Sequence, residues 1–188
     1  MNPIFAAALE IQTFCRAKQW RFCFIGALAV QRWGEPRLTL DVDVTLLTGL
    51  GTEAVFVDAL LDRFAGRIPD AREFALRHRV LLIEGMASIP IDVALVAIPF
   101  EERAIVRASD FVIQPGVVLT TCSAEDLIVF KAFAGRDKDW LDIEGIITRQ
   151  GDRLDEALIW AEAEPLLALK DAPEGARRLR SALARRRD

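Results

Sequence analysis

The sequence has few of the residues that build zinc sites or disulfide frameworks. Its 188 residues include one histidine, His78, and three cysteines, which lie far apart at Cys15, Cys23 and Cys122. No CxxC pair occurs, so neither a zinc site nor a set of disulfides is expected. Cys23 and Cys122 stand among apolar residues and are typical of small core side chains.

Long apolar runs are also missing. The longest uncharged stretch, Phe111–Ala124, is broken by Pro115-Gly116 and is too short to span a bilayer. The first residues lack basic side chains, and Glu10 interrupts the apolar run that follows, which argues against a signal peptide. We therefore expect a cytoplasmic protein with no membrane partner. About half of the residues are apolar and 28% are charged, which predicts an ordinary packed core.

The charge is unevenly distributed along the chain. The net charge is −4, but the last twelve residues carry six arginines and one aspartate, so the rest of the chain carries −9. An acidic body with a basic tail is not typical of a general nucleic-acid binder. The tail also has an apolar stripe at Leu179, Ala182 and Leu183, which favours a solvated amphipathic helix. Binding of a nucleic-acid phosphate backbone is the alternative.

Periodicity predicts an α+β core followed by a helical region. We expect a core at residues 1–122 and a C-terminal helical region at residues 123–188 packed on it. Thr52 is predicted to cap a helix, and Ser123 with Asp126 resembles a capping box. Strands are predicted at 21–26, 38–47, 72–77, 80–84, 89–95, 110–113 and 117–120, and helices at 4–18, 27–33, 53–65, 100–107, 124–134, 138–149, 153–168 and 174–186.

Three aspartates interrupt these predicted strands. Asp41 and Asp43 are two residues apart and would project from one face, while Leu40, Val42 and Val44 point toward a core. Two like charges in a half-buried sheet repel each other, and a hard cation such as Mg²⁺ would relieve the repulsion. Asp92 lies within a second apolar run and could join the same face if the two strands are neighbours. The alternative is an edge strand with outward-facing acids.

Residues near the first two acids suit an anionic ligand. A strand that ends at Gly26 and runs into a helix lets backbone amides approach a phosphate. Arg37 and Thr39 precede Asp41 by four and two residues, so a continuous strand would place them on the acidic face. They could steer phosphate or nucleobase, or Arg37 could simply balance the negative charge.

Lys131 is the single charge between Leu127 and Gly135 on an apolar predicted helix. A buried ammonium needs an anion, because an unpaired charge away from water is costly. A nucleotide phosphate is one candidate, and a structural ion pair with Asp139 or Asp142 is the other. We favour the phosphate, with one of these aspartates as the resting partner.

The motifs together resemble nucleotidyltransferases of the DNA polymerase β type. The pattern is carried by Ile25-Gly26-Ala27, by Asp41-Val42-Asp43-Val44 and by Ile91-Asp92-Val93. The segment Arg37–Asp43 looks like the R-x-T-x-D-x-D of enzymes similar to the AbiEii abortive-infection toxins, and Glu125–Ile143 resembles their second block. The resemblance covers roughly residues 22–147. Ala27 departs from it, since this position usually carries Ser or a second Gly.

This resemblance implies a mixed or antiparallel sheet flanked by helices, and transfer of a nucleotide from an NTP to an acceptor hydroxyl. Asp41, Asp43 and Asp92 would bind two Mg²⁺ ions, and Asp92 would help to deprotonate the acceptor. The implied acceptor is tRNA or another RNA, and the implied protein partner is an antitoxin. A catalytically silent nucleotide- or partner-binding module and a nucleotidyltransferase acting on small molecules, as in antibiotic modification, are the alternatives. The implied nucleotide-binding residues are Gly26, Ala27, Arg37, Thr39 and Lys131.

Overall fold

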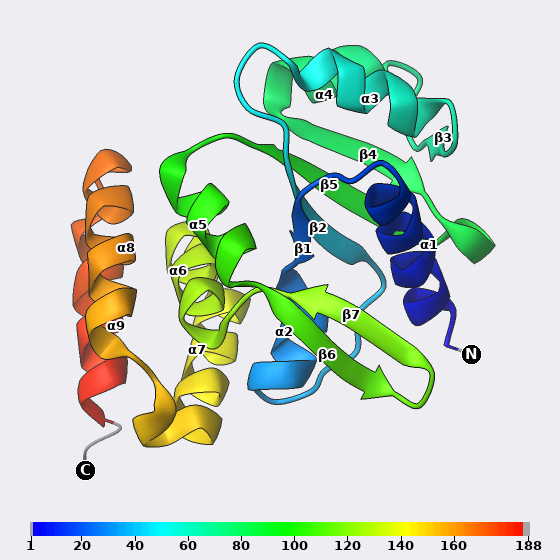
Figure 1. Ribbon diagram of the computed structural model, residues 1–188. Coiled ribbons are helices and arrows are strands. Elements are labelled where there is room, and N and C mark those ends of the chain that lie inside the picture. Colours follow the sequence, from blue (N-terminus) through cyan, green and yellow to red (C-terminus); the bar gives the residue numbers. More distant parts are fainter. Residues whose placement is uncertain (1, 186–188) are drawn as a thin grey trace. The chain divides into compact units, whose positions relative to one another are not determined.

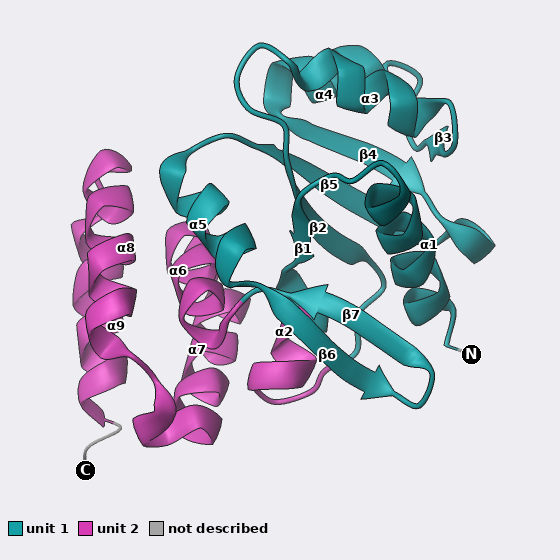
Figure 2. Ribbon diagram, in the orientation of Figure 1, with its two compact units in different colours: residues 1–28, 38–122 teal, residues 29–37, 123–188 magenta. Residues whose placement is uncertain are grey.

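The computed structural model describes residues 2–185, which form two compact units (Figure 2). The first unit contains the chain up to Leu28 together with Leu38–Cys122, and the second contains Ala29–Arg37 together with the chain from Ser123 onward. Helix α2 (Gly26–Trp33) therefore begins in the first unit and ends in the second. The division into a core at 1–122 and a packed helical region at 123–188 stays a prediction.

The first unit is built on one mixed sheet with the strand order β3-β4-β5-β2-β1-β7-β6 (Figure 1). Strand β2 is parallel to β5 and β1 is parallel to β7, while the other neighbouring strands are antiparallel. The strands are β1 (Phe22–Phe24), β2 (Val42–Leu47), β3 (Ala65–Gly66), β4 (Val80–Glu84), β5 (Pro90–Val96), β6 (Ser109–Gln114) and β7 (Val117–Thr121).

Helices in the first unit share one hydrophobic core with this sheet. Buried side chains of α1, α3 and α4 pack with those of the central strands. Asn2 begins α1 by accepting a hydrogen bond of 2.9 Å from the amide of Ile4. The sheet and its flanking helices confirm the predicted α+β class. The helices are α1 (Pro3–Ala17), α3 (Glu53–Leu61), α4 (Ala71–His78) and α5 (Pro99–Arg107), with a short 3₁₀ helix at Met86–Ser88.

The two faces of the central strands differ in burial. Val42 and Val44 of β2 are buried in the core, as are Ile91 and Val93 of β5. Each such side chain contributes about 1.5–3 kcal/mol when it leaves water, which fixes the register of its strand. The residues between them project from the opposite face, because side chains alternate along a strand. That opposite face carries the acids.

The second unit is helical. Helix α6 begins as predicted, because Ser123 accepts a hydrogen bond of 3.0 Å from the amide of Asp126. Gly135 ends α6 in the left-handed conformation (φ 72°), which allows a tight turn into the next helix. The further helices are α7 (Asp137–Gln150), α8 (Glu156–Leu169) and α9 (Pro173–Ala184), which follow α6 (Ala124–Ala134), with a 3₁₀ turn at Gly151–Arg153.

The basic tail is a helix as far as it is described. Leu179, Ala182 and Leu183 of α9 are buried, as the apolar stripe indicates. Its arginines are partly engaged within the unit: Arg178 lies over the ring of Trp140 at 4.8 Å and Arg180 over that of Trp160 at 5.2 Å. The predictions for Arg186 and Arg187 lie outside the described residues.

Three local predictions are wrong. Strand β2 begins only at Val42, and Leu40 is 82% exposed instead of facing the core. No neighbouring strand pairs with residues 38–41 in the described sheet, so this segment lacks the hydrogen-bond ladder of a strand. Residues 72–77 belong to helix α4, where Ala71 and Ala75 are buried at helical spacing. Thr52 occupies the N-cap position of α3, but its side chain makes no capping hydrogen bond, and its hydroxyl donates to the carbonyl of Thr48.

A small basic cluster, Arg77, His78 and Arg79, lies at the end of helix α4. Arg77 and His78 end helix α4, and Arg79 follows in the left-handed region. Arg79 forms an ion pair with Glu53, and His78 packs against Phe74.

Among the helices of residues 2–185, none combines the length and apolar character needed to cross a membrane.

Candidate active site

Two acidic side chains lie opposite each other on neighbouring strands. Strands β2 and β5 run parallel, and their register places Asp43 directly across from Asp92. Residues in register project from the same face of a sheet, so the two carboxylates share a face. Both residues are partly buried. The structure thus meets the condition under which the sequence predicted a shared acidic face.

Asp41 adds a third negative charge to this face. It directly precedes β2, is partly buried and lies two residues before Asp43. The hydroxyl of Thr39 donates a hydrogen bond of 2.6 Å to Oδ1 of Asp41 and so orients its carboxylate. The charge of Asp41 also contributes to raising the pKa of Asp92. Asp41 therefore acts electrostatically on the same site as the two strand acids.

The surroundings of Asp92 change the pKa of its carboxyl group. Burial raises the pKa of Asp92 above its ordinary value, the Arg67 guanidinium opposes that rise, and the charge of Asp41 adds to it. The Nη2 of Arg67 forms an ion pair with Oδ1 of Asp92. A guanidinium thus stands beside this acid.

Both the backbone conformation at position 26 and the lack of space for a side chain there require a glycine. Gly26 has a φ of +57°, a region that residues with a Cβ seldom occupy. A Cβ at this position would overlap Oδ2 of Asp43 and lie 2.9 Å from the Cβ of that residue. The amide of Ile25 donates a hydrogen bond of 3.0 Å to the carbonyl of Asp43, which holds the two segments together. The glycine therefore lets the chain turn directly against the acid.

Helix α2 starts at this glycine. The first amides of a helix have no partner within the helix, and its N-terminus carries partial positive charge. Such a terminus suits phosphate groups. Ala27 is buried, so its methyl group packs inward and only its backbone amide is available for an anion. The amides of Gly26 and Ala27 are thus candidates for nucleotide contacts.

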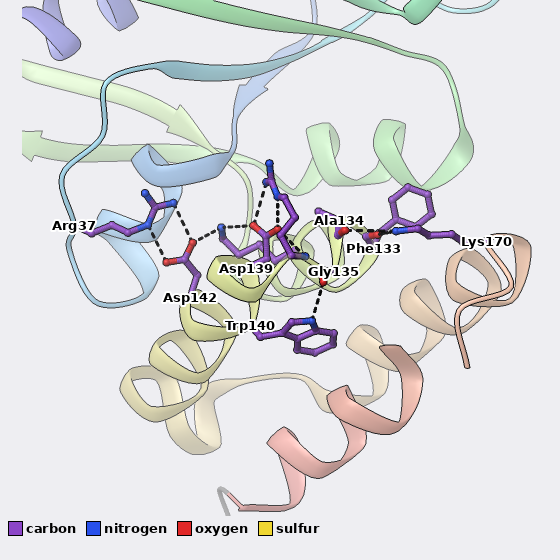
Figure 3. A network of polar contacts seen from close by, with 10 residues as sticks. Arg37, Phe133, Ala134, Gly135, Asp139, Trp140, Asp142 and Lys170 are labelled. Carbon is purple, nitrogen blue, oxygen red and sulfur yellow. Dashed lines mark hydrogen bonds and ion pairs between the residues drawn. The ribbon is translucent and has the colours of Figure 1, made fainter. Parts of the chain in front are cut away.

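Lys131 belongs to a buried network of charges in the second unit. Its partners Asp139 and Asp142 are labelled in Figure 3. Lys131 is 5% exposed, and its Nζ donates a hydrogen bond of 2.6 Å to Oδ2 of Asp142. Its Nζ also lies 3.5 Å from Oδ1 of Asp139, and the Nε of Arg136 donates a hydrogen bond of 2.6 Å to Oδ2 of the same aspartate. Lys131 therefore has the ion pairs that the structural alternative requires. Its contact with phosphate stays a prediction.

Arg37 also belongs to this network. Its Nε and Nη2 donate to the two carboxylate oxygens of Asp142 at 3.0 and 3.1 Å. Burial would raise the pKa of Asp142, but the hydrogen bonds from Arg37 and Lys131 outweigh it and hold that pKa below its usual range. The expectation that Arg37 shares the face of Asp41 on one strand is wrong, since β2 begins at Val42.

The acid site suits a hard divalent cation, although the described residues contain no preformed cluster of three His, Cys, Asp or Glu ligands. Carboxylate oxygens are the donors that such ions prefer. The absence of a side chain at Gly26 lets Oδ2 of Asp43 lie directly against the start of α2. Asp41 and Asp43 would hold the ion, and Asp92 could join them only after its contact with Arg67 is released.

Comparisons with known proteins identify the fold. No model of a known protein family matches the sequence, and no curated protein matches it. An antigenic nucleotidyltransferase-like protein from Paracoccidioides brasiliensis is structurally similar, with a TM-score of 0.56, 13% identity and coverage of 95% of this chain and 93% of that one. The antibiotic-resistance factor ANT(2'')-Ia is similar with a TM-score of 0.57, 12% identity and coverage of 90% and 96%. The chain has the fold of nucleotidyltransferase-like proteins.

Sequence reasoning missed Arg67. The residue follows the two-residue strand β3, and no local motif marks it. Its partner Asp92 lies 25 positions further along the chain. The contact depends on the order β3-β4-β5, which the sequence pattern alone does not reveal.

Proposed function

We propose that this protein is a magnesium-dependent nucleotidyltransferase that moves a nucleotide from an NTP to an acceptor hydroxyl. The observation that carries the proposal is the placement of Asp43 opposite Asp92 on parallel strands, with Gly26 packed directly against Asp43. The similarity of the fold to nucleotidyltransferase-like proteins supports it. A fold alone does not establish an activity, so the acids carry the argument.

The acids and the start of α2 have complementary tasks in this proposal. Asp41 and Asp43 bind the cation that accompanies the triphosphate, and the amides of Gly26 and Ala27 bind phosphate oxygens. Bound Mg²⁺ supplies charge neutralisation for attack on the α-phosphorus, with pyrophosphate leaving. Asp92 helps to deprotonate the acceptor hydroxyl. Positioning and electrostatic stabilisation account for most of the catalysis in such a transfer.

The acceptor is proposed from the sequence. The blocks at Arg37–Asp43 and Glu125–Ile143 resemble those of the AbiEii-type toxins, which favours tRNA or another RNA as acceptor and an antitoxin as protein partner. A small molecule is the second candidate, because one protein of similar fold is an antibiotic-resistance factor. A nucleotide-binding module without catalysis is the third, and Ala27 in place of Ser or Gly favours it.

Transfer of label from each NTP tests these alternatives. Each of the four NTPs, labelled at the α-phosphate, is incubated with the protein and Mg²⁺ in the presence of total RNA or of a panel of hydroxyl-bearing antibiotics. Label in RNA supports the RNA acceptor, and label in an antibiotic supports the small-molecule alternative. NTP binding without any transfer contradicts the enzyme proposal and leaves the binding module.

A further inference from the structure

Arg67 reaches Asp92 across an intervening strand. Its amide donates a hydrogen bond of 3.0 Å to the carbonyl of Leu82 on β4, and Leu82 is in register with Asp92 on β5. Asp92 is in turn in register with Asp43 on β2. These residues form a row across one face of the sheet, because partners in register project to the same side. The guanidinium therefore approaches the acid site from the sheet edge, over Leu82.

The contact between Arg67 and Asp92 is incomplete. Only Nη2 of Arg67 is bonded to the acid, and among residues 2–185 its Nε is the one buried side-chain nitrogen or oxygen without a hydrogen-bond partner. Arg72, nearby in sequence, bonds both carboxylate oxygens of Asp58 through Nε and Nη2. A buried donor without a partner loses its hydration and gains nothing in return. The ion pair of Arg67 with Asp92 thus lacks the bidentate geometry, with two parallel N–H···O bonds, that is typical of structural arginine–carboxylate pairs.

Arg67 also has room to move. Its side chain is 26% exposed and that of Asp92 is 36% exposed, so water and ions reach the pair. Because both side chains are partly exposed, the guanidinium can leave the acid and turn toward solvent without displacing the core.

We propose that Arg67 is an exchangeable counter-ion of the acid site. While the site holds no metal, Arg67 neutralises Asp92 and limits its repulsion from Asp41. When a divalent cation is bound by Asp41 and Asp43, Arg67 turns away and Asp92 becomes a ligand. A free cation therefore binds weakly, since it must first displace a positive charge. This inference rests on the proposed metal-dependent function and adds a positioning residue that controls metal loading.

Binding of Mn²⁺ to the full chain without nucleotide measures this competition directly. Mn²⁺ has the charge and oxygen preference of Mg²⁺, and its free concentration can be followed by electron paramagnetic resonance. Arg67→Met keeps an apolar stem and removes the charge, so we expect Mn²⁺ to bind about five- to tenfold more tightly than to the wild type. The matched variant Arg16→Met removes an exposed ion pair with Asp110 of β6, at the other end of the strand order, and should leave the affinity unchanged. Adding Asp92→Asn to Arg67→Met should abolish the gain.

The outcomes separate this inference from the proposed function. If Asp43→Asn weakens Mn²⁺ binding but Arg67→Met does not tighten it, the counter-ion role is overturned and the metal site stands. If Asp43→Asn has no effect on Mn²⁺ binding, both proposals are overturned.

A measurement on the unmodified protein covers the case in which Arg67→Met does not fold. In wild type labelled with ¹³C and ¹⁵N, the Nε–H resonance of Arg67 should move on addition of Mg²⁺, while that of Arg16 should not. An Arg67 signal that stays in place, while carboxylate resonances of the site report bound Mg²⁺, overturns the counter-ion role.

Discussion

Replacing Gly26 with alanine tests whether the glycine turn shapes the acid site. A φ of +57° costs an alanine roughly 1 kcal/mol. The new methyl group would also overlap Oδ2 of Asp43 and lie 2.9 Å from its Cβ. Rotation of the carboxylate relieves the first contact but not the second, so β2 or the start of α2 has to shift, which costs about 1–3 kcal/mol more. We expect Gly26→Ala to lower the free energy of unfolding by about 2–4 kcal/mol.

Gly116 provides the matched control for this substitution. It has a φ of +79°, and a Cβ added there would meet no heavy atom within 4 Å. Gly116→Ala therefore incurs the conformational cost alone, about 1 kcal/mol. Urea denaturation of both variants gives the two losses. The difference between them measures the steric conflict between position 26 and Asp43.

The effect of Gly26→Ala on ligand binding at the acid site can be measured as the rise in melting temperature that Mg²⁺ and NTP cause. A ligand at 100 times its dissociation constant stabilises the native state by about 2.7 kcal/mol, which is visible as a higher melting temperature. Gly116→Ala should keep the stabilisation by Mg²⁺ and NTP, and Gly26→Ala should lose it because Asp43 is displaced. Equal losses of stability in the two variants, or full stabilisation by Mg²⁺ and NTP in Gly26→Ala, would refute the reasoning.

Two further predictions concern the acids and the buried lysine. The double substitution Asp41→Asn with Asp43→Asn should fold normally and abolish the rise in melting temperature caused by Mg²⁺ and NTP; an unchanged rise would remove the metal assignment. Lys131→Met should lower the free energy of unfolding by about 3 kcal/mol, because Asp142 and Asp139 lose a buried partner, and should leave nucleotide affinity unchanged. Unchanged stability in denaturant with weaker nucleotide binding would instead support the predicted phosphate contact.

The sequence pattern reveals what depends on local spacing. Alternation of apolar and acidic residues around Asp43 and around Asp92 predicts two strands with acids on one face, and the register of β2 with β5 agrees. The glycine between a strand and a helix is also local, and its φ of +57° agrees with a turn at Gly26. These features can be predicted from the sequence because the direction of side chains along a strand repeats every two residues, whatever the neighbouring strands are.

Features that depend on residues far away in the sequence cannot be predicted from local sequence patterns. Residues 38–41 alternate like a strand but have no strand to pair with, and alternation cannot show that. Residues 72–77 contain a short apolar run, Phe74-Ala75-Leu76, that suits a strand or a helix, and the burial of Ala71 and Ala75 follows the helical period. The contact of Arg37 with Asp142 spans 105 positions, so the position of Arg37 in the chain gave no sign of it.

Asp92 provides the most direct test of the central claim that the three aspartates form a catalytic site. In the proposed geometry Asp41 and Asp43 are sufficient to bind the nucleotide with its metal, whereas Asp92 acts chiefly in the transition state. An interaction made in the transition state affects turnover far more than ground-state binding. The measurement is the rate of transfer of α-label to the acceptor, made beside Mg-NTP affinity for wild type and Asp92→Asn. The account predicts affinities within a few-fold of each other and a loss of transfer by orders of magnitude. Transfer by Asp92→Asn at the wild-type rate, or binding without transfer by the wild type, would contradict it.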